Sequence, residues 1–148
     1  GELPCGGSQR VEDLYIAGQG GTFPTPYVSF ERDRGVLALA GESHPENAAS
    51  FYAPLILWLD ALIEGPPRRV VFDVRLAFFS RAARPQLLAM LRRLRLWSSR
   101  GAEVLVQWHV DLEDDDMIDI AADFGTMSGL PVRVLREAMH SPPVGSSF

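Results

Sequence analysis

Residues 36–64, with the sequence VLALAGESHPENAASFYAPLILWLDALIE, decide the fold of this chain. The stretch opens on a short apolar run, which predicts a strand over 36–40. Further on, apolar side chains recur at a spacing of three to four, the pattern of a helix with one buried face: Tyr52, Leu55, Ile56, Leu59, Leu62 and Ile63. A strand that passes directly into a long amphipathic helix predicts an α/β domain.

The break between this strand and this helix contains signals for a helix start. Ser43 and Glu46 have the spacing of a capping box, in which two side chains satisfy two free backbone N–H groups. Pro45 fits the first turn, where its missing N–H is not needed. The sequence therefore predicts a helix over about 44–64, capped by Ser43 and ended by Gly65-Pro66-Pro67.

The other elements follow from apolar runs separated by turn residues. Strands are predicted over 14–16, 27–30, 70–79, 103–110 and 132–135, and the strand at 27–30 forms a hairpin with 36–40. A second helix is predicted from Ser80 to near Gly101, and a third leads from the acidic run at 111–116 through Phe124 to Gly129. The predicted fold is a mixed, mostly parallel sheet with about three helices and an N-terminal β-hairpin.

Length and composition set the limits of the domain. A chain of 148 residues is long enough to bury most of its apolar surface in one core. We expect one domain over 14–136, a flexible lead-in over 1–13 and a disordered tail over 137–148. The single Cys5 excludes an internal disulfide, and a net charge of −5 argues against a nucleic-acid partner. No signal peptide or membrane span is recognised, so we expect a cytoplasmic protein without a membrane partner.

The topology predicts where a functional site would lie. Loops that leave the carboxyl ends of parallel strands meet at one edge of the sheet. Three segments are therefore expected to come together there, and they are residues 41–47, 78–83 and 109–116.

These three segments carry a resemblance to a known family. Residues 41–48, GESHPENA, are similar to the Gly-Glu-Ser-x-Pro-Glu-Asn signature of the SiaC family of bacterial regulatory phosphoproteins. Further matches follow at Phe51-Tyr52, Trp58-Leu59, Trp108-His109, 113–117, Asp123-Phe124 and Leu130-Pro131. The resemblance extends over roughly residues 14–135 and implies a STAS-like fold, similar to that of the anti-sigma-factor antagonists.

The resemblance also implies a role in signal transduction. SiaC proteins are phosphorylated by a dedicated kinase and dephosphorylated by a phosphatase. The unmodified form binds and activates a diguanylate cyclase, which links the family to cyclic-di-GMP signalling and biofilm formation. The implied function is a signalling adaptor that acts through protein–protein interaction and is not an enzyme. Its implied contact surface is the sheet edge with Glu42, Asn47, Ser80, Arg81 and Arg84, and a homodimer is a further option.

The sequence departs from the family at the phospho-acceptor. Family members carry Asn-Thr-Ser-Ser at the start of the second helix, and the Thr accepts the phosphate. The matching run here is Ser80-Arg81-Ala82-Ala83. Arg81 therefore occupies the acceptor position, and a guanidinium mimics neither threonine nor the anionic phosphothreonine. The switch is then lost, moved to Ser80 or replaced by permanent partner binding.

Each of these polar residues also has a purely structural interpretation. Ser80 is either a helix N-cap or a relocated phosphosite. Arg81 and Arg84 pair with an acidic partner, pair with the acidic run, or remain solvated. The acidic run complements the positive end of the third helix, with partner docking and cation binding as alternatives.

An alternative function rests on two histidines. His44 and His109 are both expected at the sheet edge formed by the carboxyl ends of the parallel strands. Two imidazoles with one carboxylate are a ligand set that binds zinc or iron in proteins. This would make the chain a small metal-binding protein or enzyme. Packing or surface exposure of both residues is the competing interpretation. No nucleophile–base pair, Walker loop or dinucleotide fingerprint is present, so no cofactor is implied.

Overall fold

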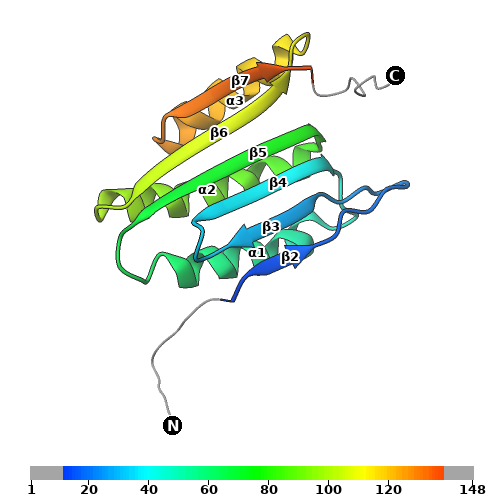
Figure 1. Cartoon of the computed structure of the whole chain (residues 1–148). Coiled ribbons are helices and arrows are strands. Elements are labelled where there is room, and N and C mark those ends of the chain that lie inside the picture. The colour runs from blue at the N-terminus through cyan, green and yellow to red at the C-terminus, as the bar shows by residue number, and fades with distance from the viewer. Residues whose placement is uncertain (1–11, 139–148) are drawn as a thin grey trace, which may run out of the picture.

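The computed structural model describes residues 12–138, and these contain one mixed sheet with strand order β2-β3-β4-β5-β6-β7. Figure 1 shows this order across the molecule. The strands are Leu14–Ile16, Tyr27–Glu31, Val36–Ser43, Arg69–Phe79, Glu103–Asp111 and Val132–Glu137. The first three strands pair antiparallel, and β4 to β7 run parallel to one another. The predicted fold class and the N-terminal hairpin are confirmed.

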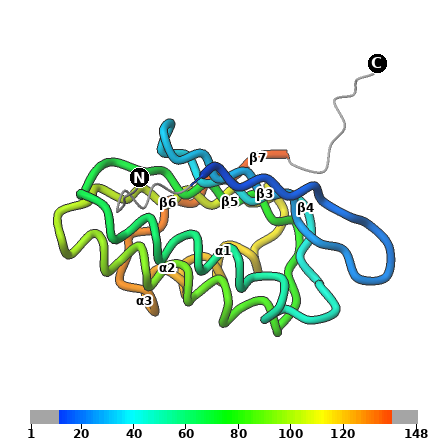
Figure 2. Tube along the Cα trace, turned by 90° about the horizontal axis from the view of Figure 1, so that it is seen from below, coloured from blue at the N-terminus to red at the C-terminus, as the bar shows by residue number. Residues whose placement is uncertain are grey.

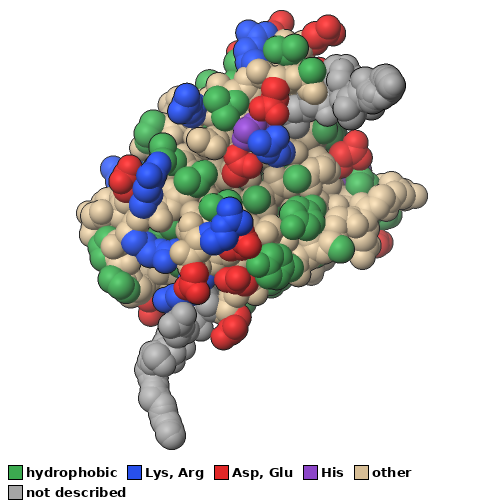
Figure 3. All heavy atoms as spheres, viewed as in Figure 1, with side chains coloured by type: hydrophobic (Ala, Val, Ile, Leu, Met, Phe, Trp, Pro, Cys, Tyr) green, Lys and Arg blue, Asp and Glu red, His purple; other side chains and the backbone are tan. Residues whose placement is uncertain are grey.

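Three helices cover one face of this sheet. They are α1 (Ala48–Leu62), α2 (Arg84–Ser99) and α3 (Asp115–Ser128), and a 3-10 turn at Arg81–Ala83 precedes α2. Figure 2 shows all three helices on the same side, so no helix of residues 12–138 covers the other face of the sheet, called the open face below. On that open face, charged and hydrophobic side chains are interspersed (Figure 3). No helix within residues 12–138 has both the length and the apolar run that a bilayer crossing requires.

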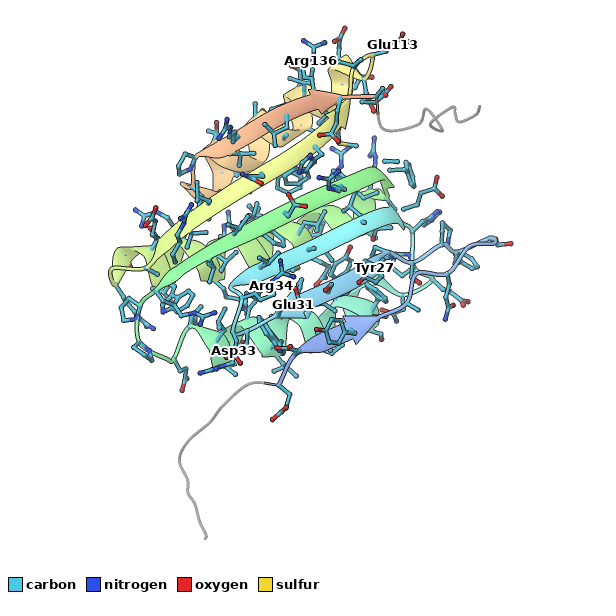
Figure 4. The ribbon with its side chains drawn as sticks, in the orientation of Figure 1. Tyr27, Glu31, Asp33, Arg34, Glu113 and Arg136 are labelled. Atoms are coloured by element: carbon cyan, nitrogen blue, oxygen red, sulfur yellow. The ribbon has the colours of Figure 1, made fainter. Side chains whose placement is uncertain are left out.

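The hairpin of β3 and β4 depends on a glycine. Gly35 has a φ of +68°, and a Cβ atom there would lie 2.8 Å from the carbonyl oxygen of Arg69. Only glycine therefore fits both the left-handed backbone and the close approach to β5. The turn also contains an ion pair between Arg34 and Glu31 at 2.7 Å, and Figure 4 shows both side chains beside the strand.

The core lies between the sheet and the three helices. The predicted apolar stripe of α1 is buried at Tyr52, Leu55 and Leu59, and all three tryptophans are buried. Trp108 of β6 stacks on Phe124 of α3, with ring centroids 5.1 Å apart. This contact packs α3 against β6, next to the end strand β7 of the sheet.

The start of α1 differs from the prediction. The strand β4 continues to Ser43, and α1 begins only at Ala48 with Asn47 as its N-cap. The Asn47 side chain accepts a hydrogen bond from the backbone N–H of Ser50 at 3.0 Å. The predicted capping box of Ser43 and Glu46 is therefore wrong, because pairing with β5 carries the strand through Ser43. The predicted lead-in and tail fall largely outside the described residues.

Candidate partner-binding edge

The carboxyl ends of the parallel strands form a single edge of the sheet. At this edge Ser43 of β4 lies opposite Phe79 of β5, and the backbone N–H of Ser80 donates to the carbonyl oxygen of Ser43 at 2.8 Å. The 3-10 turn at Arg81–Ala83 also contacts α1. Glu42, Asn47, Ser80, Arg81 and Arg84 thus lie at the same end of the molecule, and their role in binding stays a prediction.

Ser80 acts as a cap in the structure. Its hydroxyl oxygen accepts a hydrogen bond from the backbone N–H of Ala83 at 3.3 Å, and its side chain is half-buried. The structural interpretation of Ser80 is confirmed by this bond. The Ser80 hydroxyl thus provides a partner for the Ala83 N–H, which the first turn would otherwise leave unpaired. The hydroxyl therefore has a structural role without a phosphate.

Arg81 and Arg84 are exposed but have different surroundings. Within residues 12–138, Arg81 has no hydrogen bond or ion pair, so its guanidinium faces solvent. Arg84 lies over the ring of Phe79, with its guanidinium carbon 5.7 Å from the ring centroid. Neither forms an ion pair with the acidic run, so that predicted pairing is not seen. The acidic run instead supplies Asp114, whose carboxylate caps α3 by accepting from the N–H of Met117 at 3.0 Å.

A cavity of about 460 Å³ opens at the same edge between β5 and β6. It exists because these two strands stop pairing after Val74 and Trp108, although β5 continues to Phe79 and β6 to Asp111. Two of the three segments predicted to meet at this edge line it, residues 41–47 through Gly41 and residues 109–116 through Val110, Asp111, Glu113 and Asp114. The remaining lining comes from Arg75, Leu76, Ala77 and Met117, and residues 78–83 do not contribute.

The two histidines do not share a site. His44 is exposed and has edge-on ring contacts with Phe23 and Phe78, at centroid distances of 5.8 and 6.1 Å. His109 lies on the open face of the sheet between two carboxylates, with Nε2 2.6 Å from Asp73 and Nδ1 2.8 Å from Glu137. Within residues 12–138 no group of three His, Cys, Asp or Glu side chains is arranged to hold a metal ion. The structure therefore lends no support to the metal-binding alternative.

Sequence reasoning missed the ion cluster around His109. Arg75 completes it, since its guanidinium lies 3.3 Å from Asp73 and 3.1 Å from Glu137. The hydrogen bond from His109 is the main reason that the pKa of Glu137 is lowered. The signal was in the sequence: β5 carries charged residues at positions 73 and 75, two apart and hence on one face of a strand.

A buried hydrogen bond joins the edge to α1. The hydroxyl groups of Ser43 and Tyr52 are 2.6 Å apart, and both residues are fully buried. Burial raises the pKa of Tyr52 to about 12, while the hydrogen bond between Tyr52 and Ser43 opposes that rise. The phenol therefore stays neutral and holds the end of β4 against the helix.

Replacing this phenol tests the bond. We expect Tyr52→Phe to lower the free energy of unfolding by about 1–2 kcal/mol, because the Ser43 hydroxyl is left buried without its partner. Urea unfolding followed by circular dichroism measures the change. Tyr27→Phe, at an exposed tyrosine on β3, serves as the matched control. The double variant with Ser43→Ala should recover part of the loss, since both polar partners are then gone.

The pH dependence gives a second readout for the same variant. A folded pKa of about 12 lies above the ordinary value of 10.0. The contribution of Tyr52 is then complete below pH 10 and is lost as the pH rises from about 10 to 12, because the unfolded phenol ionises first. The stability difference between wild type and Tyr52→Phe should shrink over this range. A constant difference would contradict the buried position of the phenol.

Fold and edge together define a class of protein: an α/β domain with helices on one sheet face and polar side chains gathered at the carboxyl ends of its parallel strands. The chain belongs to the SiaC family of regulatory phosphoproteins, whose family model matches residues 20–136. This confirms the family that the sequence motifs indicate.

Relatives and solved structures agree with this assignment. The uncharacterized protein PA14_02130 of Pseudomonas aeruginosa (strain UCBPP-PA14) is 24% identical over 124 residues, which cover 84% of this chain and 96% of the relative. A chain in the crystal structure of the diguanylate cyclase SiaD with its activator SiaC, from Pseudomonas aeruginosa, matches with a TM-score of 0.77 at 23% identity; the match covers 84% of this chain and all of that chain. The structure of apo-SiaC from the same organism has a TM-score of 0.75 at 23% identity, covering 84% of this chain and 98% of that chain. At these identities the structures show a shared fold.

Proposed function

We propose that this protein is a cytoplasmic signalling adaptor that binds and activates a diguanylate cyclase, and that Arg81 keeps it in one permanent state. The observation that carries the proposal is Arg81 itself. Its guanidinium is exposed, without a polar partner in residues 12–138, at the position that matches the family's phospho-acceptor. The family is regulatory, and a SiaC protein of Pseudomonas aeruginosa activates the diguanylate cyclase SiaD.

The chemistry of Arg81 supports a lost switch. A guanidinium carries its positive charge at all physiological pH values and has no hydroxyl to accept a phosphoryl group. A kinase and phosphatase of the family would then have no acceptor at this position. Ser80 is a weaker substitute, because its half-buried hydroxyl already caps the turn that leads into α2. The partner surface that meets this corner would carry acidic groups opposite Arg81 and Arg84.

Mass spectrometry tests the lost switch directly. The protein is incubated with ATP and a kinase that phosphorylates a SiaC protein carrying the acceptor threonine. We expect no mass gain for the wild type, and a gain of about 80 Da for Arg81→Thr, because the substitution restores a hydroxyl at an exposed turn. A gain on wild type that disappears in Ser80→Ala would show that the phosphosite has moved and would overturn the lost switch.

Charge reversal tests the contact surface. We expect Arg81→Glu to weaken binding to a diguanylate cyclase by about tenfold or more, since a partner built for a cation then meets an anion. Binding is measured by calorimetry against the cyclase recovered from the native lysate, with Pseudomonas aeruginosa SiaD as a second probe. Arg92→Glu is the matched control, because Arg92 is an exposed arginine of α2 away from its first turn. Equal binding by wild type and Arg81→Glu would remove this corner from the interface.

A further inference from the structure

In the part of the chain that the structure describes, the strand β7 lies at an end of the sheet, and no strand pairs with the outer side of its backbone. Among residues 12–138, β7 pairs only with β6, and the other end strand, β2, has three residues against the six of β7. The carbonyl oxygen of Glu137 accepts from the N–H of Leu112 at 3.0 Å, so the backbone of Glu137 faces β6. Backbone groups alternate sides along a strand, so those of Val134 and Arg136 point outward.

The side chains of β7 are arranged in a self-complementary order. Arg133, Leu135 and Glu137 lie on the open face of the sheet, because their register partners on β6 are Gln107, His109 and Asp111 and Glu137 bonds His109 there. A two-fold axis through Leu135 brings two copies of β7 together antiparallel. It places Arg133 of each copy opposite Glu137 of the other, with the two leucines facing each other at the centre.

Backbone and side chains select the same register. With the axis at Leu135, Val134 of one copy lies opposite Arg136 of the other, and these are the residues whose N–H and C=O point outward. Val134 and Arg136 therefore form the hydrogen-bonded pairs of the ladder. The Leu135–Leu135 and Arg133–Glu137 pairs are non-hydrogen-bonded pairs, in which the side chains approach most closely. An axis at Val134 would instead place Arg133 opposite Leu135 and leave both charges without a counterpart.

The surroundings of the strand leave room for a second copy. On the helix side, a shallow groove of about 600 Å³ flanks the start of β7, lined mostly by small residues of α3 and the following turn, among them Ala122, Gly125 and Thr126. Arg136 is held by its own chain, donating to the carbonyl oxygen of Leu112 at 2.9 Å; Figure 4 shows it at the end of β7 near Glu113.

The two charges that the pairing uses are accessible. Arg133 is exposed, and its side chain has no hydrogen bond or ion pair within residues 12–138. The side chain of Glu137 remains 41% exposed despite its contacts with Arg75 and His109. Charged residues on an edge strand usually prevent pairing, but opposite charges in this self-complementary order favour one pairing with a second copy of the same strand.

We propose that the protein forms a two-fold homodimer in which β7 pairs antiparallel with β7 of a second copy, creating one continuous sheet through both molecules. This surface lies on β7, whereas Ser80, Arg81 and Arg84 lie at the turn that leads into α2. A variant that disrupts the β7 dimer should therefore leave partner binding at Arg81 and Arg84 intact. A variant that disrupts partner binding there should likewise leave the dimer intact.

Sedimentation equilibrium of the full chain tests the proposal. We expect the wild type to have twice the mass of the chain, and Arg133→Glu to weaken the dimer on the order of 30-fold, because two attractive cross-strand pairs become repulsive. The conservative variant Arg133→Lys keeps the positive charge opposite Glu137 and should retain the dimer. Arg92→Glu is the charge-matched control and should leave the dimer intact.

A backbone variant separates this interface from any other. Val134→Pro removes an N–H that points away from β6, so it should abolish the dimer while circular dichroism shows an unchanged fold. A wild type that is monomeric at all concentrations overturns the proposal. So does a dimer that survives Arg133→Glu or Val134→Pro, since its interface must then lie elsewhere.

Discussion

Trp108→Ala is expected to lower the free energy of unfolding by about 3–5 kcal/mol, the largest effect of any substitution considered for this domain. Trp108 is completely buried on the helix-covered side of β6. Its ring stacks on Phe124 at 5.1 Å with planes 19° apart and meets the edge of Phe79 at 6.1 Å. Phe79 and Phe124 also touch, at 5.9 Å. Removing the indole therefore opens a cavity within a cluster of three rings that joins β5, β6 and α3.

Urea unfolding followed by circular dichroism measures this loss, because tryptophan fluorescence would itself change in the variant. Trp108→Phe is the matched control. It keeps an aromatic ring against Phe124 and removes the indole N–H, which is buried and has no hydrogen-bond partner within residues 12–138. We expect Trp108→Phe to cost about 1–2 kcal/mol, since the smaller cavity is partly offset by the loss of an unsatisfied donor. Equal losses for the two variants would contradict the stacking argument.

The parts of the fold that were predictable from the sequence depend on local signals. The β-branched run at the start of β5 predicts a central strand, and the structure places it between β4 and β6. Ser80 was predicted as the N-cap of the second helix, and it caps the 3-10 turn that leads into α2, which itself begins only at Arg84. The cap was predictable because it involves residues only three positions apart. Gly129 ends α3 with a φ of +82°, a conformation that favours glycine over any residue with a side chain.

The start of α1 was not predictable because tertiary contacts override a local signal there. Ser43 has the right spacing for a capping box, yet its carbonyl oxygen accepts from Ser80 and its hydroxyl contacts Tyr52. Both partners lie outside the capping motif, and together they keep Ser43 extended and buried. Asn47 then takes over as the cap, one residue before the helix.

The candidate edge was predictable as a place but not in its contacts. The rule that parallel strands end at one edge correctly brings together the ends of β4 and β5 and the loop after β6. This rule does not say which residues of neighbouring strands lie side by side, and the hydrogen-bond partners of His109 depend on that register. Asp73 and Glu137 are 36 and 28 residues away along the chain, on two different strands. A shift of one residue in either pairing would turn them to the opposite face.

The ion cluster around His109 joins three strands through one ring. The two ring nitrogens of His109 contact carboxylate oxygens of Asp73 and Glu137. Arg75 bridges the same two carboxylates. The cluster thereby links β5, β6 and β7 on the sheet face opposite the three helices.

His109→Ala is therefore expected to lower the free energy of unfolding by about 2–3 kcal/mol, because it removes two charge-assisted hydrogen bonds from carboxylates that water reaches only in part. His44→Ala is the matched control; that ring is exposed and makes only edge contacts with Phe23 and Phe78, so its loss should cost under about 1 kcal/mol.

The pH dependence of stability distinguishes a lost ion cluster from a simple cavity at His109. Since His109 holds the pKa of Glu137 below its ordinary value, the contribution of Glu137 is present above that value and is lost as the medium becomes more acidic. Unfolding measured as the pH falls below 4.5, the ordinary pKa of the Glu137 carboxyl, should thus show a steeper loss for wild type than for His109→Ala, whereas parallel profiles would mean that His109 does not stabilise this carboxylate.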